Sequence, residues 1–113
     1  MHELSIMESA LSLALEQARQ AGAGRVLTLR LRVGVLSGVA PEALEFAFEV
    51  LAPGTCAAGA ALAIESVPAR FWCGGCSREF QADELLAECP GCHQASGEIR
   101  AGRELELASL EIE

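Results

Sequence analysis

The residues best suited to chemistry in this chain are cysteines arranged as two Cys-x-x-Cys pairs, about a dozen residues apart. The positions inside each pair are glycine or proline, which tight turns need, so each pair can direct two thiolates at one point. Four thiolates fill the tetrahedral shell of Zn²⁺ and leave no open position for a substrate. The spacing therefore predicts a structural zinc site with the ligands Cys73, Cys76, Cys89 and Cys92.

Other uses of these cysteines are less consistent with the sequence. Disulfides need an oxidising compartment, but Met1 is not followed by a basic start and Glu8 interrupts the apolar run, so no export signal is evident and we expect a cytoplasmic protein. Thioredoxin-like chemistry needs one pair that opens a helix after a strand. His93 could in principle replace a sulfur, but a four-sulfur set is already complete, and we interpret it as a surface histidine. Cys56 lies far from both pairs and is expected to be a half-buried thiol.

Composition narrows the class of protein. The chain has 113 residues, a formal net charge of −8 and no lysine, which argues against nucleic-acid binding. No apolar run is long enough to cross a membrane, so we expect one soluble unit. The zinc segment has too few large apolar residues to fold on them alone, so metal binding must supply much of its folding free energy. These residues are Phe71, Trp72, Phe80, Leu85 and Leu86.

Two amphipathic segments open the chain. The stretch from Glu3 to Ala21 has a helical period that Gly22 and Gly24 end. Its expected apolar face consists of Leu4, Met7, Leu11, Leu15 and Ala18. The stretch from Val26 to Leu36 alternates like a half-buried strand. Its expected core face consists of Leu27, Leu29, Leu31, Val33 and Val35.

The remaining pattern predicts a helix and two more strands. Pro41 suits the first position of a helix that runs to about Leu51 and is followed by a strand over 60–67, an order that favours a parallel pair. In the last strand, over 104–113, the apolar residues change phase, which a bulge at Ala108 and Ser109 would correct. We therefore predict an α+β fold of two helices on a small three-stranded mixed sheet, with the four-cysteine zinc ribbon inserted. Residues 1–68 and 102–113 would form the α/β domain, and residues 69–101 the zinc-binding domain.

The first residues could bind a second metal. His2 beside a free amino terminus offers an imidazole, the terminal amine and backbone amide nitrogens in small chelate rings. Such a planar nitrogen set suits Ni²⁺ or Cu²⁺, whereas Zn²⁺ prefers a tetrahedron. In an arbitrary protein, however, a His-Glu start is more often a frayed end in which Glu3 favours the helix dipole.

The whole chain resembles the HypA/HybF family of hydrogenase nickel-insertion proteins. The resemblance lies in the Met1-His2-Glu3 start, the segment from Val33 to Leu44, the residues Phe46-Ala-Phe48 with Gly54-Thr55, and the paired cysteine motifs, in matching order and spacing. It implies a metallochaperone that transports Ni²⁺ bound at Met1, His2 and Glu3 and keeps a structural Zn²⁺. It also implies a HypB-type GTPase and the large subunit of nickel-iron hydrogenase as partners, and some relatives also serve urease.

One residue departs from the family pattern. Many members carry an acidic residue near the nickel where this chain has Ala40. Glu42, water or another backbone donor could complete the nickel shell, and we favour the planar nitrogen set without a carboxylate from this loop.

Competing functions can be ranked. A zinc-ribbon adaptor without metal delivery is the main alternative. With no open metal site, no nucleophile and base pair and only two histidines, neither an enzyme nor a nickel store is supported. Whether the chain forms a homodimer is left open.

Overall fold

The computed structural model describes residues 3–83 and 87–113. Two predicted nickel residues, Met1 and His2, and two apolar residues of the zinc segment, Leu85 and Leu86, lie outside the described residues. The described elements are α1 (Glu3–Gln20), β1 (Val26–Gly34), α2 (Pro41–Leu51), β2 (Ala61–Val67), β3 (Arg70–Cys73), β4 (Arg78–Gln81), β5 (Ala87–Glu88), β6 (Ala95–Ser96), β7 (Ile99–Ala101) and β8 (Leu105–Ile112). Neither helix of the described chain is long and apolar enough to cross a membrane.

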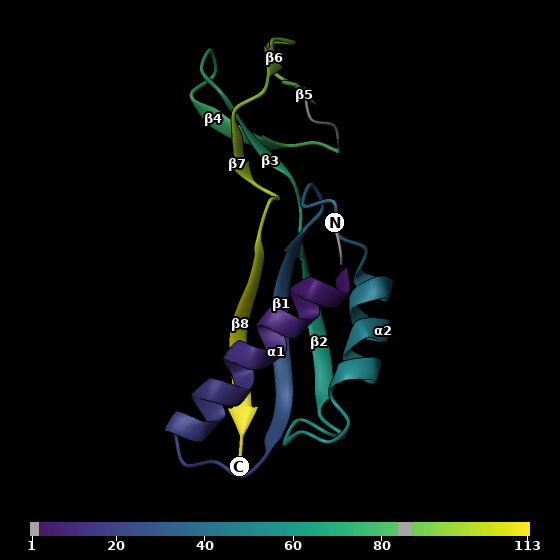
Figure 1. The fold of residues 1–113 in the computed structure, drawn as a ribbon. Coiled ribbons are helices and arrows are strands. Elements are labelled where there is room, and N and C mark those ends of the chain that lie inside the picture. The colour runs from purple at the N-terminus through teal and green to yellow at the C-terminus, as the bar shows by residue number, and fades with distance from the viewer. Residues whose placement is uncertain (1–2, 84–86) are drawn as a thin grey trace.

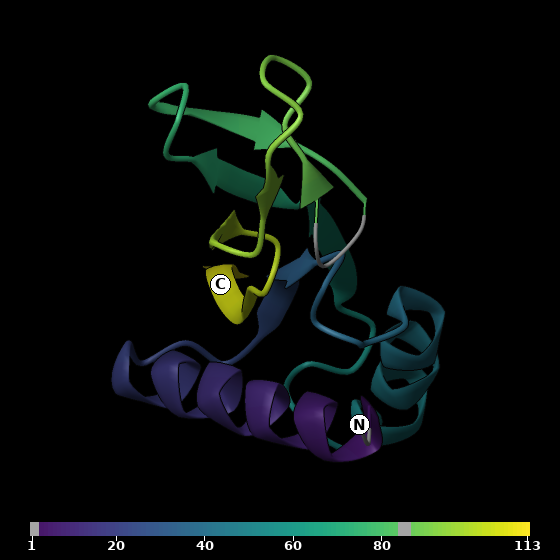
Figure 2. The same ribbon diagram turned by 90° about the horizontal axis from the view of Figure 1, so that it is seen from above.

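The larger sheet has the strand order β2-β1-β8, with both helices on one of its faces (Figures 1 and 2). β1 pairs with β2 in parallel and with β8 antiparallel, which confirms the predicted mixed sheet. The other face carries Arg32, whose guanidinium bridges Glu65 at 3.1 Å and Glu106 at 3.2 Å. The sheet therefore buries one face under the helices and pairs charges on the other.

α1 covers the sheet with small and medium side chains. Its buried residues are Met7, Leu11, Ala14 and Ala18. Leu4, which we had placed on this face, is 50% exposed, because it lies in the first turn at the margin of the sheet. Gly22 ends the helix with φ +71°, and Ala23 N–H bonds the Ala18 carbonyl at 2.9 Å, as in a Schellman motif.

β1 confirms most of the predicted alternation. Leu29, Leu31 and Val33 are buried, whereas Leu27 is only half-buried. The prediction for Val35 was wrong: β1 ends at Gly34, the chain turns there, and the Val35 side chain is 53% exposed beyond the cover of the helices. Thus the period located the core face correctly but not the point where that face ends.

β8 contains the predicted bulge. Its pairing with β1 shifts between Arg30 and Leu31, which face Ser109 and Leu107, so Ala108 is the extra residue. The shift lets three leucines on both sides of the bulge pack against the same core: Leu105, Leu107 and Leu110. Ile112, at the end of the strand, is exposed.

The segment between β2 and β8 folds around a second core. Its sheet has the order β4-β3-β7, and β5 and β6 form a two-stranded ribbon. Phe71 and Phe80 stack with ring centroids 5.8 Å apart, and the Arg100 guanidinium lies 4.6 Å from the Trp72 ring. Because β2 and β8 both flank β1, this segment is inserted between two strands of one sheet, as predicted. The exact domain boundaries stay a prediction.

Two glycines bring the crossing chains at the junction into close contact. An added Cβ on Gly34 would lie 2.0 Å from the Gly102 carbonyl oxygen, a distance that no side chain tolerates. Gly102 itself has φ +114° and packs on Ala69. Leu36 donates its N–H to the Gly102 carbonyl at 2.7 Å, and its side chain packs against the second core. The junction is therefore held backbone to backbone.

Candidate metal centre

Four sulfurs meet at the tip of the inserted segment. Cys73 and Cys76 lie at the end of β3 and in the turn to β4, and Cys89 and Cys92 lie in the turn between β5 and β6. All four sulfurs lie within 4.8 Å of one another. The Cys73–Cys92 pair is 3.4 Å apart and the Cys76–Cys89 pair 3.9 Å apart. The structure thus brings together the four residues that the spacing selected.

Backbone N–H groups in each turn point at the first sulfur of the pair. Cys76 N–H donates to Cys73 Sγ at 3.4 Å, and Gly91 N–H donates to Cys89 Sγ at 3.3 Å. Such bonds favour the thiolate, which is the form that binds metal. Each turn therefore directs a backbone N–H group at one sulfur of the site.

The sulfurs differ in acidity. A hydrogen bond from the backbone N–H of Cys92, followed by that of Gly91, lowers the pKa of Cys89 to about 6 although burial opposes it. The Cys92 sulfur, followed by those of Cys89 and Cys73, raises the pKa of Cys76 to about 12. One sulfur thus carries charge readily while a neighbour keeps its proton. A dication at their centre would favour the ionised form of all of them.

This donor set fits zinc. Four sulfurs at roughly 2.3 Å from one centre lie about 3.8 Å apart, and the observed separations bracket that value. Soft thiolate donors in a tetrahedron favour Zn²⁺ over harder ions. The arrangement is closed, so it can hold an ion and stabilise the surrounding segment, but it offers no position at which a substrate could bind.

The remaining thiol and the imidazole of the described chain lie apart from this cluster. His93 is exposed, and its Nδ1 lies 2.7 Å from Glu88 Oε1, which agrees with the surface interpretation. Cys56 is half-buried and packs against the larger core, also as expected.

Sequence reasoning missed two backbone positions of the centre. Ser77 and His93, each directly after the second cysteine of a pair, have φ of 51° and 63°. The two turns therefore have the same left-handed exit, although neither residue is glycine. The signal in the sequence was that both residues directly follow the second cysteine of a pair.

Sequence reasoning also missed Arg78. An added Cβ on Gly91 would lie 2.5 Å from the Arg78 guanidinium and 3.4 Å from Cys76 Sγ, so this cation lies beside the sulfurs.

Of the candidate nickel residues, the structure describes only Glu3. It opens α1, next to the start of α2 (Figure 1). Its Oε2 accepts a hydrogen bond from Ala40 N–H at 3.3 Å, so the loop before α2 borders the start of α1. Ala40 supplies no carboxylate there. Glu42, in the first turn of α2, has an exposed side chain.

Comparisons with known proteins match one family over almost the whole chain. The family model described as "Hydrogenase/urease nickel incorporation, metallochaperone, hypA" matches residues 1–112. The hydrogenase maturation factor HypA of Picosynechococcus sp. is 45% identical over 112 residues, 99% of each chain, and that of Methylocella silvestris 42% over 113 residues, all of both chains. The solution structure of the Ni metallochaperone HypA from Helicobacter pylori superposes with a TM-score of 0.68 at 28% identity, covering 99% of this chain and 97% of that one.

Proposed function

We propose, from the fact that this chain belongs to the HypA family of nickel-incorporation metallochaperones, that it carries one Ni²⁺ at its amino-terminal tip and delivers it during maturation of nickel-iron hydrogenase. The family consists of metallochaperones and not of enzymes. We propose Met1, His2 and Glu3 as the nickel site. The four cysteines would hold a structural Zn²⁺. The assignment of the two metals to two different sites rests on the closed sulfur cluster. Its four sulfurs complete one metal shell, so the delivered metal must bind elsewhere.

The proposed nickel donors are nitrogens. The terminal amine of Met1, the His2 imidazole and the intervening backbone amides can form a planar set, which Ni²⁺ accepts. The Glu3 carboxylate already receives the Ala40 N–H, so Glu3 contributes its backbone nitrogen first. A site at a chain end lets ligands exchange with few packed groups to rearrange, which suits a carrier that must release its metal.

The partners follow from the family. We propose a HypB-type GTPase and the large subunit of a nickel-iron hydrogenase, met in the cytoplasm, where cysteines stay reduced. In support, all five cysteines are free thiols in the structure, and each metal-site cysteine has its sulfur in the cluster. A homodimer is compatible with this function but is not needed for it.

A metal titration tests the nickel site. Untagged protein should bind one Zn²⁺ and about one Ni²⁺ per chain, and His2→Ala should lose the nickel and keep the zinc. Glu42→Gln is the matched control, since its exposed side chain at the start of α2 should not be needed. One residue added before Met1 should also weaken nickel binding if the terminal amine is a donor. Loss of nickel in Glu42→Gln but not in His2→Ala would refute the site.

The alternative function is a zinc-stapled adaptor without metal delivery. It shares the sulfur cluster, but it predicts that zinc content and partner binding do not depend on His2. Wild-type protein that binds no stoichiometric Ni²⁺ would favour the adaptor.

A further inference from the structure

β8 has an open edge. It pairs with β1 on one side, and within residues 3–83 and 87–113 no strand pairs with its other side. The Glu104 carbonyl accepts the Gly34 N–H at 2.7 Å, and Glu113 N–H donates to the Arg25 carbonyl at 2.9 Å, so both residues direct backbone groups toward β1. Backbone groups alternate in direction along an antiparallel strand, so Glu106, Ser109 and Glu111 also direct theirs toward β1. With Ala108 as the bulge, the alternate residues direct their backbone groups to the open edge. These are Leu105, Leu107, Leu110 and Ile112.

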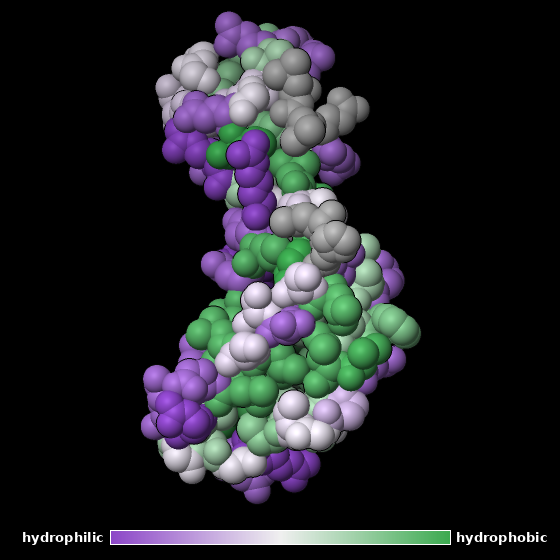
Figure 3. Space-filling view, in the orientation of Figure 1, coloured by the Kyte–Doolittle hydropathy of each residue, from purple (hydrophilic) through white to green (hydrophobic). Residues whose placement is uncertain are grey.

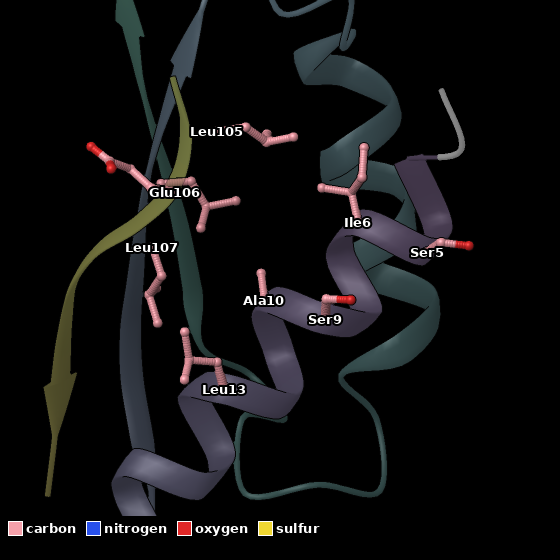
Figure 4. Close-up of a pocket in the computed structure, with 9 residues that line it drawn as sticks. Ser5, Ile6, Ser9, Ala10, Leu13, Leu105, Glu106 and Leu107 are labelled. Carbon is pink, nitrogen blue, oxygen red and sulfur yellow. The ribbon is translucent and has the colours of Figure 1, made fainter. Parts of the chain in front are cut away.

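An apolar groove lies beside this edge. It has a volume of about 600 Å³ between α1 and β8. Figure 4 shows Ile6, Ala10 and Leu13 of α1 directed toward the same space as the β8 leucines, while Glu106 points away. In the space-filling view, apolar side chains gather over the half of the molecule that holds α1 and β8 (Figure 3).

α1 extends farther than the sheet that it covers. Seen from above, its C-terminal half continues past β8 (Figure 2). Leu13, in that part of the helix, is 50% exposed and lines the groove. A further strand added beside β8 would therefore still pack on α1. Its inward side chains would fill the groove.

The negative charge of β8 limits which kind of strand could bind at its edge. No lysine or arginine occurs from Glu104 to the end of the chain, and β8 itself carries Glu111 and Glu106, of which Glu106 also pairs with Arg32 of β1. A second copy of β8 in the added position would place carboxylates opposite carboxylates, in a chain that already has a net charge of −8. Like charges directly opposite destabilise a strand pair, whereas opposite charges stabilise it. A strand with basic side chains on its outer face suits this edge.

We propose that the β8 edge and its groove bind an extended segment of a partner protein, in which apolar side chains alternate with lysine or arginine. The partner's backbone would pair with the open edge of β8, its apolar side chains would enter the groove, and its basic side chains would meet the carboxylates. This is strand addition, in which the backbone supplies affinity and alternate side chains supply specificity. The surface uses no residue of either metal site.

A synthetic probe tests the mode of binding. The probe is a capped, fluorescein-labelled peptide of alternating valine and lysine, with eight residues to match β8. Fluorescence anisotropy with the zinc-loaded full chain should show saturable binding. N-methylation of the alternate residues that face β8 keeps the side chains and charge but blocks the backbone pairing, and it should weaken binding at least about tenfold. Equal binding of the methylated peptide would overturn strand addition.

Two leucines of α1 provide matched variants. Leu13 and Leu4 are both 50% exposed, but only Leu13 lines the groove. Leu13→Glu should weaken peptide binding at least about tenfold, and Leu4→Glu by less than about twofold. Circular dichroism and zinc content should match wild type for both. Equal losses in the two variants, or equal binding of a valine–glutamate peptide, would overturn the proposal. Dimerisation of the wild type that Leu13→Glu abolishes would identify a second copy as the occupant and overturn it too.

Discussion

At the scale of single residues, the sulfur cluster depends on four cysteines, and the fifth is a control within the same chain. Cys89 is fully buried, and its sulfur accepts backbone N–H groups. Cys89→Ser should abolish stoichiometric zinc binding and change the near-ultraviolet circular dichroism of Trp72, because its segment depends on the metal. Cys56→Ser should keep both signals, since Cys56 packs in the other core. Zinc retained by Cys89→Ser would contradict this assignment.

His93 should matter through its backbone and not through its imidazole. It has φ 63° and lies outside the sulfur set. His93→Asn should keep zinc content and stability, because asparagine tolerates the left-handed region. His93→Val should lower the free energy of unfolding of the zinc-loaded protein by about 1–2 kcal/mol. Zinc titration and urea unfolding provide the test, and zinc loss in His93→Asn would show that the imidazole is a ligand.

The sequence was most informative at this scale where chemistry fixes the residue type. Only cysteine supplies four sulfurs, so spacing alone predicted the cluster that the structure brings together. The left-handed position of Ser77 could not be predicted, because serine is rare at positive φ. His93 offered a weak signal, since histidine is enriched there but still adopts positive φ in only a small minority of cases.

At the scale of elements, the junction between the strands is the position most sensitive to a single methyl group. Gly34→Ala places a Cβ 2.0 Å from the backbone oxygen of Gly102, which cannot move without shifting β8. We expect a loss of about 3 kcal/mol or more in the free energy of unfolding, measured with urea. Gly24→Ala is the control: nothing lies within 4 Å of its added Cβ, so the change should be within about 0.5 kcal/mol. Equal effects in both variants would contradict this packing.

Periodicity predicted the elements but not their margins. The change of phase in the last strand led to the bulge at Ala108, because only an extra residue restores the leucines to one face. Leu4 and Val35 follow the same periods and yet are exposed, since periodicity does not say where the covering element ends. The contact of Gly34 with Gly102 is equally hidden, because it joins segments far apart in the chain.

At the scale of the whole molecule, the two cores should respond differently to loss of metal. They share no residue, and only the smaller one contains cysteines of the cluster. Removing zinc with a chelator should abolish amide protection in β3, β4 and β7 and retain it in β1 and β2, as measured by hydrogen exchange. Simultaneous loss of protection in both sheets would contradict this independence and the predicted division into two domains.

The groove between α1 and β8 could not be predicted from the sequence. The helices, strands and insertion followed from patterns, but the groove depends on how far α1 extends past β8, which no pattern encodes. The amino terminus could be proposed as a metal site only because of the family resemblance. A short His-Glu start is by itself weak support for a metal site.

The central claim is that sulfur keeps one ion while the chain's first residues carry another. The most direct measurement is metal content after untagged protein, loaded with zinc and nickel, is exposed to a mild chelator. We predict that nickel leaves while zinc remains, that the loaded protein shows no sulfur-to-nickel charge-transfer absorption, and that His2→Ala retains zinc but never acquires nickel. Nickel bound with thiolate absorption, or retained equally by His2→Ala, would contradict the account.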